Sequence, residues 1–196
     1  MNNSKKIEIC ESYKEFSPPS WVRRTVTRLI DGVPENYLIG LHSLTLTNID
    51  GLNHSRRRQK TISRKRKVAV RECRGLYHYK WQGKPASIEL FVDKIIDRWP
   101  FMVLKIPLFQ DLLLADVLYH ELGHHIHKTS APEHREREDV AENWQKKLRR
   151  HYFRQRYKWL KPVRFILKPI VAILLKLVRL IQRKTARVNH SLREGR

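Results

Sequence analysis

Cysteine is scarce in this chain. Cys10 and Cys73 are the two cysteines among 196 residues, they lie far apart, and no CxxC pair occurs. Two distant cysteines cannot build the dense disulfide framework that stabilises small secreted domains. We therefore expect free thiols with a structural role, in a reducing compartment.

Long uninterrupted apolar runs are missing as well. The first residues, MNNSKKIEICESYKEF, contain no continuous apolar stretch, so we expect no secretory signal and a cytoplasmic protein. Residues 162–184 are largely apolar, but they are interrupted by Arg164, Lys168, Lys176 and Arg179. Each charge at the centre of a bilayer costs about 2.5–3.5 kcal/mol. The sequence therefore argues against a simple transmembrane helix.

Acidic residues are almost absent from two segments. Residues 55–67 carry eight basic side chains and no acid, and residues 143–196 carry seventeen against the single acid Glu194. The formal net charge is +22, and the rest of the chain is close to neutral. We expect an ordinary folded body with two basic segments. We interpret residues 55–67 as a solvated loop that can contact the phosphates of a membrane or of nucleic acid.

The basic residues between 164 and 183 follow a helical period. At 100° per residue they fall within about 120° of a helix surface, and the opposite face is apolar. This pattern is typical of a helix that lies in an anionic membrane surface. The alternative is a helix that packs on the protein's own body with its charges outward. Either way, the sequence predicts a basic, amphipathic C-terminal helix within a tail of residues 151–196.

The remaining chain predicts a flexible N-terminal arm (1–20) and one α+β domain (21–150). Residues 21–30 fit a helix or a strand equally well. Alternating apolar residues predict strands at 37–49, 68–73, 75–81 and 86–96, with the last two forming a hairpin. The strand at 86–96 is either an edge strand that can bind an extended peptide or an interior strand. A long helix over 108–128 follows, and the capping-box pair Ser130 and Glu133 predicts the start of a second helix.

The predicted long helix contains the stretch LYHELGHHIHK. His120 and His124 are four residues apart, which puts both rings on one helix face where a single tetrahedral zinc ion can bind them. Glu121 can direct a carboxylate at a water molecule on the metal. Gly123 lets another element approach closely. The HExxH spacing therefore predicts a zinc centre.

A third protein ligand must come from elsewhere. A metzincin would need glycine at 127 and histidine at 130, but His127 and Ser130 occupy these positions. In the following predicted helix, Glu138 precedes Ala141 by three residues, so both can face the helix that carries His120 and His124. Glu138 is therefore our predicted ligand. Three histidines compete with it for this position: His125, His127 and His134. If they are not ligands, we interpret them as solvent-facing or supporting residues.

Together, HELGHHIH and EREDVAENW resemble the gluzincin-type minimal metallopeptidases of the ImmA/IrrE family. In that family a helix with the pattern ExxA(N/D)xF follows the HExxH helix, and its glutamate completes the zinc site. The resemblance covers about residues 115–148 and implies His120, His124 and Glu138 as ligands and Glu121 as general base. Glu142 and Trp144 fall where the family has Asn or Asp and Phe. It also implies a zincin-like α+β fold, with a small antiparallel or mixed sheet packed on the HExxH helix and the next helix.

Three protein ligands and one open position are typical of a catalytic zinc site. We therefore expect a zinc-dependent metallopeptidase that hydrolyses a protein or peptide substrate and is held at an anionic surface, peripherally at a membrane, by its tail. Asp116, one turn before His120, and Glu142 are candidates for supporting the ligands. Two alternatives remain: a nucleic-acid-associated protease resembling the SprT-like group, and a non-catalytic membrane- or nucleic-acid-binding protein with a structural zinc site.

Overall fold

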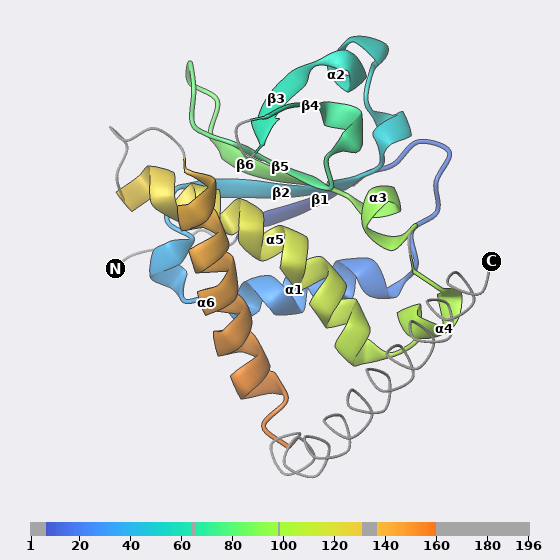
Figure 1. Ribbon diagram of the computed structural model, residues 1–196, viewed down its shortest axis with the longest axis vertical. Helices are drawn as coiled ribbons and strands as arrows, with labels where there is room; N and C mark the ends of the chain where they lie inside the picture. Colours follow the sequence, from blue (N-terminus) through green and yellow to red (C-terminus); the bar gives the residue numbers. More distant parts are fainter. Residues whose placement is uncertain (1–6, 64–65, 98, 131–136, 160–196) are drawn as a thin grey trace, which may run out of the picture. The chain divides into compact units, whose positions relative to one another are not determined.

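The computed structural model describes residues 7–63, 66–97, 99–130 and 137–159 (Figure 1). The chain divides into two units, residues 1–152 and 153–196. The predicted tail helix and His134 lie outside the described residues. Within the described part of the chain, no helix is both long enough and apolar enough to cross a bilayer.

The first unit is built around a four-stranded mixed sheet. Its strands follow the order β1 (Glu8–Ser12), β2 (Leu41–Thr47), β6 (Ala86–Phe91) and β5 (Gly75–His78). The first three strands are parallel, and β5 pairs with β6 in the antiparallel direction. A mixed sheet combined with long helices makes the fold α+β, as predicted.

Helix α5 (Pro107–Ser130) lies along the sheet and contacts α1 (Trp21–Asp31), β5 and β6 (Figure 1). The ambiguous segment 21–30 is therefore a helix. Its apolar residues recur every three or four positions, and Val22, Val26 and Leu29 are fully buried. The third long helix is α6 (Glu138–Arg156). One polar network joins these three helices. The buried carboxylate of Asp111 on α5 pairs with Arg28 of α1 and accepts a hydrogen bond from Tyr152 of α6.

The prediction of a loose arm over residues 1–20 is wrong for residues 8–12. These residues form β1, an edge strand whose register joins Glu8 to Ser43 and Ser12 to Thr47. Because β1 is exposed or only half-buried along its length, its sequence is largely polar and lacks the apolar alternation that predicts a strand. Main-chain pairing and the bond from Thr47 Oγ1 to Ser12 O (2.6 Å) hold it instead.

The prediction of a solvated loop at 55–67 is also wrong. The segment forms α2 (His54–Arg58) and an antiparallel hairpin of β3 (Lys60–Ser63) and β4 (Arg66–Ala69). Asn53 caps α2 by accepting a hydrogen bond from Arg56 N (2.8 Å). The guanidinium of Arg56 is paired with Glu89 on β6, so this charge belongs to the fold.

Several predicted element boundaries differ from the observed ones, including those of β2 and β5, which are shorter than the predicted strands. After β4 the chain forms a 3-10 helix (Val70–Glu72) instead of continuing as a strand, and after β6 it forms α3 (Val92–Ile96). Ser130 is the last residue of α5 and does not cap α6, which begins at Glu138. The remaining short elements are η1 (Glu35–Tyr37), η2 (Ile49–Gly51) and α4 (Phe101–Leu104).

Candidate metal centre

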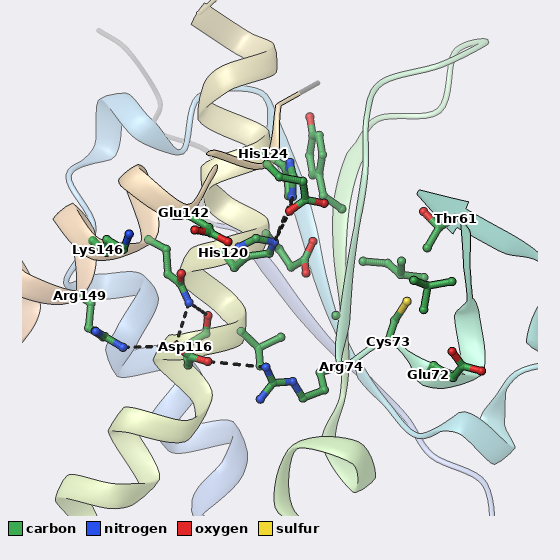
Figure 2. A pocket seen from close by; sticks show the side chains of 18 residues that line it. Thr61, Glu72, Cys73, Arg74, Asp116, His120, His124, Glu142, Lys146 and Arg149 are labelled. Carbon is green, nitrogen blue, oxygen red and sulfur yellow. Dashed lines mark hydrogen bonds and ion pairs between the residues drawn. The ribbon is translucent and has the colours of Figure 1, made fainter. Parts of the chain in front are cut away.

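The two histidines of the HExxH motif face each other on α5. The Nε2 atoms of His120 and His124 are 3.2 Å apart, and His124 is buried. Successive turns of the helix place one ring above the other, and the ring planes are nearly perpendicular at 89°. Two imidazole nitrogens therefore point at one small volume, as Figure 2 shows.

Helix α6 brings Glu138 to the same volume. Its Oε2 atom lies 3.4 Å from His120 Nε2 and 3.8 Å from His124 Nε2. Zinc bonds of about 2.0–2.1 Å in a tetrahedral arrangement require ligand atoms about 3.3–3.4 Å apart. The three observed separations are close to this value, so the residues fit a zinc ion with two nitrogen ligands and one carboxylate ligand.

Small residues set the distance between the two helices. A Cβ atom at Gly123 would lie 2.5 Å from Ala141 O and 2.8 Å from Ala141 Cα. Any side chain larger than hydrogen at position 123 would therefore push α6 away. The prediction that Gly123 and Ala141 permit close packing is confirmed. Glu138 lies one turn before Ala141, so this contact determines how near its carboxylate comes to the histidines.

Strand β5 approaches the centre from the opposite side. A Cβ atom at Gly75 would lie 2.7 Å from Val117 Cγ1 and 2.9 Å from Glu121 Oε1. The main chain of β5 therefore packs directly against the carboxylate of Glu121, which is 7% exposed. No local sequence pattern indicates this role of Gly75, because it depends on how β5 is placed over α5.

The three ligand candidates and Glu121 line one cavity of about 640 Å³. Its walls come from β5, α5, α6 and the β3–β4 hairpin, which contributes Thr61 and Val68 (Figure 2). The centre is thus not enclosed by protein on every side. A site with three protein ligands beside an open cavity has room for a further ligand or a substrate.

Asp116 and Glu142, the two predicted supporting residues, have different positions. Asp116 accepts hydrogen bonds from Gln145 (2.9 Å) and Arg149 (3.3 Å) and lies 3.8 Å from Arg74. Its carboxylate therefore belongs to an ion-pair network between α5, α6 and Arg74, the residue before β5. Its predicted role in supporting the ligands stays a prediction. Glu142 lines the cavity beside the ligand candidates.

The sequence leaves a solvent-facing or a supporting position open for His125, and its exposure of only 1% contradicts the solvent-facing one. Its Nδ1 atom is 3.2 Å from Tyr77 Oη on β5, and its Nε2 atom is 3.1 Å from Ile39 O. Burial lowers the pKa of His125, although the Ile39 carbonyl opposes this shift. A neutral ring that bridges Tyr77 and Ile39 ties β5 to α5 beside the metal residues. His127 is buried as well, which also contradicts a solvent-facing position.

Of the two alternatives for the segment 86–96, the structure has the interior strand, formed by β6. Among the described strands, β6 lies between β2 and β5, whereas β5 pairs only with β6. The open edge beside the metal centre is therefore that of β5. The bond from Phe91 N to Arg74 O (2.9 Å) puts Gly75 in a non-hydrogen-bonded pair. The main-chain groups of Gly75 and Tyr77 consequently face the open edge.

Cys73 also lines the cavity. Burial, with smaller contributions from the charges of Glu121 and Glu72, raises its pKa to about 11. The thiol is therefore protonated at neutral pH, which does not suit a nucleophile. Its Sγ atom lies 3.7 Å from Ala69 O, and the side chain packs on the small core formed by Ile49, Leu52, Val70 and Phe91.

Comparison of the chain with family models, with curated proteins and with solved structures gives no match.

Proposed function

We propose that this protein is a zinc-dependent metallopeptidase with a zincin-like arrangement. The observation that carries the proposal is the convergence of His120, His124 and Glu138, whose ligand atoms are 3.2–3.8 Å apart beside an open cavity. Zinc is the cofactor that this donor set fits best, since imidazole and carboxylate ligands in tetrahedral positions are its usual surroundings.

A zinc ion held by these residues would supply Lewis-acid polarisation of a carbonyl group and would acidify a water molecule. Glu121 lines the same cavity and is not one of the three candidate ligands, and we assign its carboxylate the role of general base. It would accept a proton from water and pass it to the leaving amine of the substrate. The reaction class is hydrolysis of an amide bond.

The open edge of β5 supports a peptide as substrate. Gly75 and Tyr77 direct main-chain groups outward along the cavity, so an extended peptide could pair with β5 as an additional strand. This pairing would carry the scissile carbonyl past Glu121, because Gly75 packs against that side chain. The predicted binding of a peptide to an edge strand is thereby moved from residues 86–96 to β5.

The proposal includes attachment of the protein to an anionic surface by its C-terminal tail. The amphipathic pattern of residues 162–183 supports a peripheral position of a cytoplasmic enzyme at an anionic membrane. The alternative of a SprT-like, nucleic-acid-associated protease draws on the same basic segments, but Arg56 already pairs with Glu89. A structural zinc site in a non-catalytic protein has less support, because structural sites are closed by four protein ligands and the described residues bring three together.

Metal analysis tests the centre. We expect about one zinc ion per chain, and we expect His120→Ala and Glu138→Ala to lose it. Asp139→Ala is the matched control, because Asp139 is the neighbour of Glu138 but is exposed and paired with Arg137. Retention of zinc in Glu138→Ala would contradict the ligand assignment.

The variant Glu121→Gln tests the enzyme. It should keep both the fold and the zinc ion while losing peptidase activity on a susceptible protein by at least about a hundredfold, because a general base contributes that much or more. Full activity in this variant would exclude the mechanism. Zinc binding without activity in the parent protein, for any peptide substrate, would favour the structural site.

A further inference from the structure

Five large apolar side chains are exposed on one short segment of the chain, residues 99–109. Phe101 is 72% exposed and Met102 is 80% exposed, and they are accompanied by Trp99, Ile106 and Phe109 at 43%, 46% and 36%. These five account for more than half of the nine exposed large hydrophobic residues in the described part of the chain. We call residues 99–109 the apolar corner. Such concentration on one short segment is unlike the scattered exposure of a typical surface.

The apolar corner is held in place by its own structure. Pro100 is the N-cap residue of α4, Pro107 is the first residue of α5, and Leu104 between them is 9% exposed. The side chain of Gln110 donates a hydrogen bond from Nε2 to Leu104 O (2.8 Å) and is itself buried. Leu104 anchors the segment inward while Phe101 and Met102 are held outward. The exposed residues therefore form a built surface.

One cation lies within the apolar corner, and one exposed acid, Asp97, precedes it. Lys105 lies over the ring of Phe101, with Nζ 4.8 Å from the ring centroid, so a cation borders the apolar side chains. Asp111, one turn beyond the corner, is fully buried and paired with Arg28, and it presents no charge outside. Between residues 99 and 109, Lys105 is the one charged residue, while the whole chain carries a net charge of +22.

We propose that the apolar corner inserts into the surface of an anionic phospholipid bilayer. Tryptophan and phenylalanine are favoured at the boundary between headgroups and acyl chains, and a neighbouring lysine can extend to the headgroups. The large positive charge of the chain attracts anionic lipid, whereas insertion of the corner itself depends on apolar contact. This surface is separate from the metal centre and does not depend on the proposed peptidase activity.

The test measures binding of the full chain to vesicles of phosphatidylcholine and phosphatidylserine by sedimentation. The double variant Phe101→Ser/Met102→Ser should bind about tenfold or more weakly, because two apolar side chains no longer enter the bilayer. Ile39→Ser is the matched control, since Ile39 is 64% exposed on another part of the same unit. It should bind like the parent. Zinc content should be equal in all three proteins.

A fluorescent label reports the position of the corner directly. An environment-sensitive dye on Met102→Cys, in a Cys10→Ser/Cys73→Ser background, should shift to the blue when vesicles are added, whereas the same dye on Ile39→Cys should not. Equal vesicle binding of parent and double variant, or no shift at position 102, would overturn the proposal. A change from dimer to monomer in the double variant would also overturn it, because the corner would then be a protein interface.

Discussion

At the scale of single residues, the missing side chain of Gly123 sets the distance between the two helices that carry the candidate metal ligands. Gly123 stands between the ligand candidates of α5 and directly under Ala141 of α6. Sequence reasoning identified both residues, because a glycine inside a helix indicates close approach by another element. The structure adds that the approaching group is main chain, which cannot rotate away.

Gly123→Ala should therefore destabilise the protein and weaken zinc binding together. A Cβ atom 2.5 Å from Ala141 O must displace α6, and overpacking of this kind costs about 1–3 kcal/mol of unfolding free energy. Because Glu138 moves with α6, we expect zinc affinity to fall as well. Urea unfolding of the metal-free protein and a zinc titration measure the two effects.

Gly83→Asn is the matched control for this substitution. Gly83 has a positive φ of +79°, which asparagine tolerates, and nothing lies within 4 Å of its Cβ position. The control should change neither stability nor zinc affinity appreciably. If Gly123→Ala kept the zinc affinity of the parent, the helix contact would not be what positions Glu138.

At the scale of elements, Glu89 connects α2 to the central sheet. Its side chain is 15% exposed, with His78 Nε2 at 2.9 Å and Arg56 Nη1 at 3.0 Å from its carboxylate oxygens. Burial alone would raise the pKa of Glu89, but the hydrogen bonds and charges of His78 and Arg56 outweigh it and lower the pKa to about 2. The ionised carboxylate is thus the form that the folded protein favours.

This pairing predicts a loss of stability in acid. An unfolded glutamate has a pKa of about 4.3, so the contribution of Glu89 is complete above that pH and disappears as the pH falls towards 2. The full contribution is at most about 3 kcal/mol. Stability curves of the parent and Glu89→Gln should therefore differ at neutral pH and converge between about pH 4 and pH 2. A difference independent of pH would show that the ionised form of Glu89 is not favoured by folding.

The same residues show what the sequence could not reveal. Helix α5 was predictable because its apolar run is long and contains no internal proline, and the spacing of His120, His124 and Glu138 follows from helical phase. The basic segment 55–67 was misinterpreted because a run of charges usually indicates solvated chain. Its structure depends on a cap at Asn53 and on a partner 33 residues away, and a local pattern cannot contain either one.

Strand β5 was predicted as a strand but not as the edge beside the metal centre. Its position follows from the order in which four strands pair, and that order is set by tertiary packing rather than by alternation along the chain. Gly75, Tyr77 and the buried His125 consequently became visible only in the structure. The candidate metal ligands were found by their spacing in the sequence, whereas the residues that shape the cavity became visible only in the fold.

At the scale of the whole molecule, the positive charge is concentrated in two segments of the sequence. Vesicle binding of the full chain, measured at increasing salt concentration, distinguishes two ways of binding an anionic surface. Charge attraction alone predicts that vesicle binding falls steeply as salt is raised, and that Leu174→Glu in the tail changes little. An interfacial helix over residues 162–183 predicts the opposite. Its apolar face contains Leu174, and burying a charge there should release the protein from phosphatidylserine vesicles even at low salt.

We expect Leu174→Glu to weaken vesicle binding about tenfold or more, because it replaces an apolar contact with a charge. The control Arg58→Gln/Lys60→Gln removes two exposed cations of the other basic segment and leaves the Arg56–Glu89 pair intact. It should weaken binding only slightly and reduce its salt dependence. If the control weakened binding more than Leu174→Glu, phosphate attraction by residues 55–67 would replace the tail as the tether, and a nucleic-acid partner would become the better proposal.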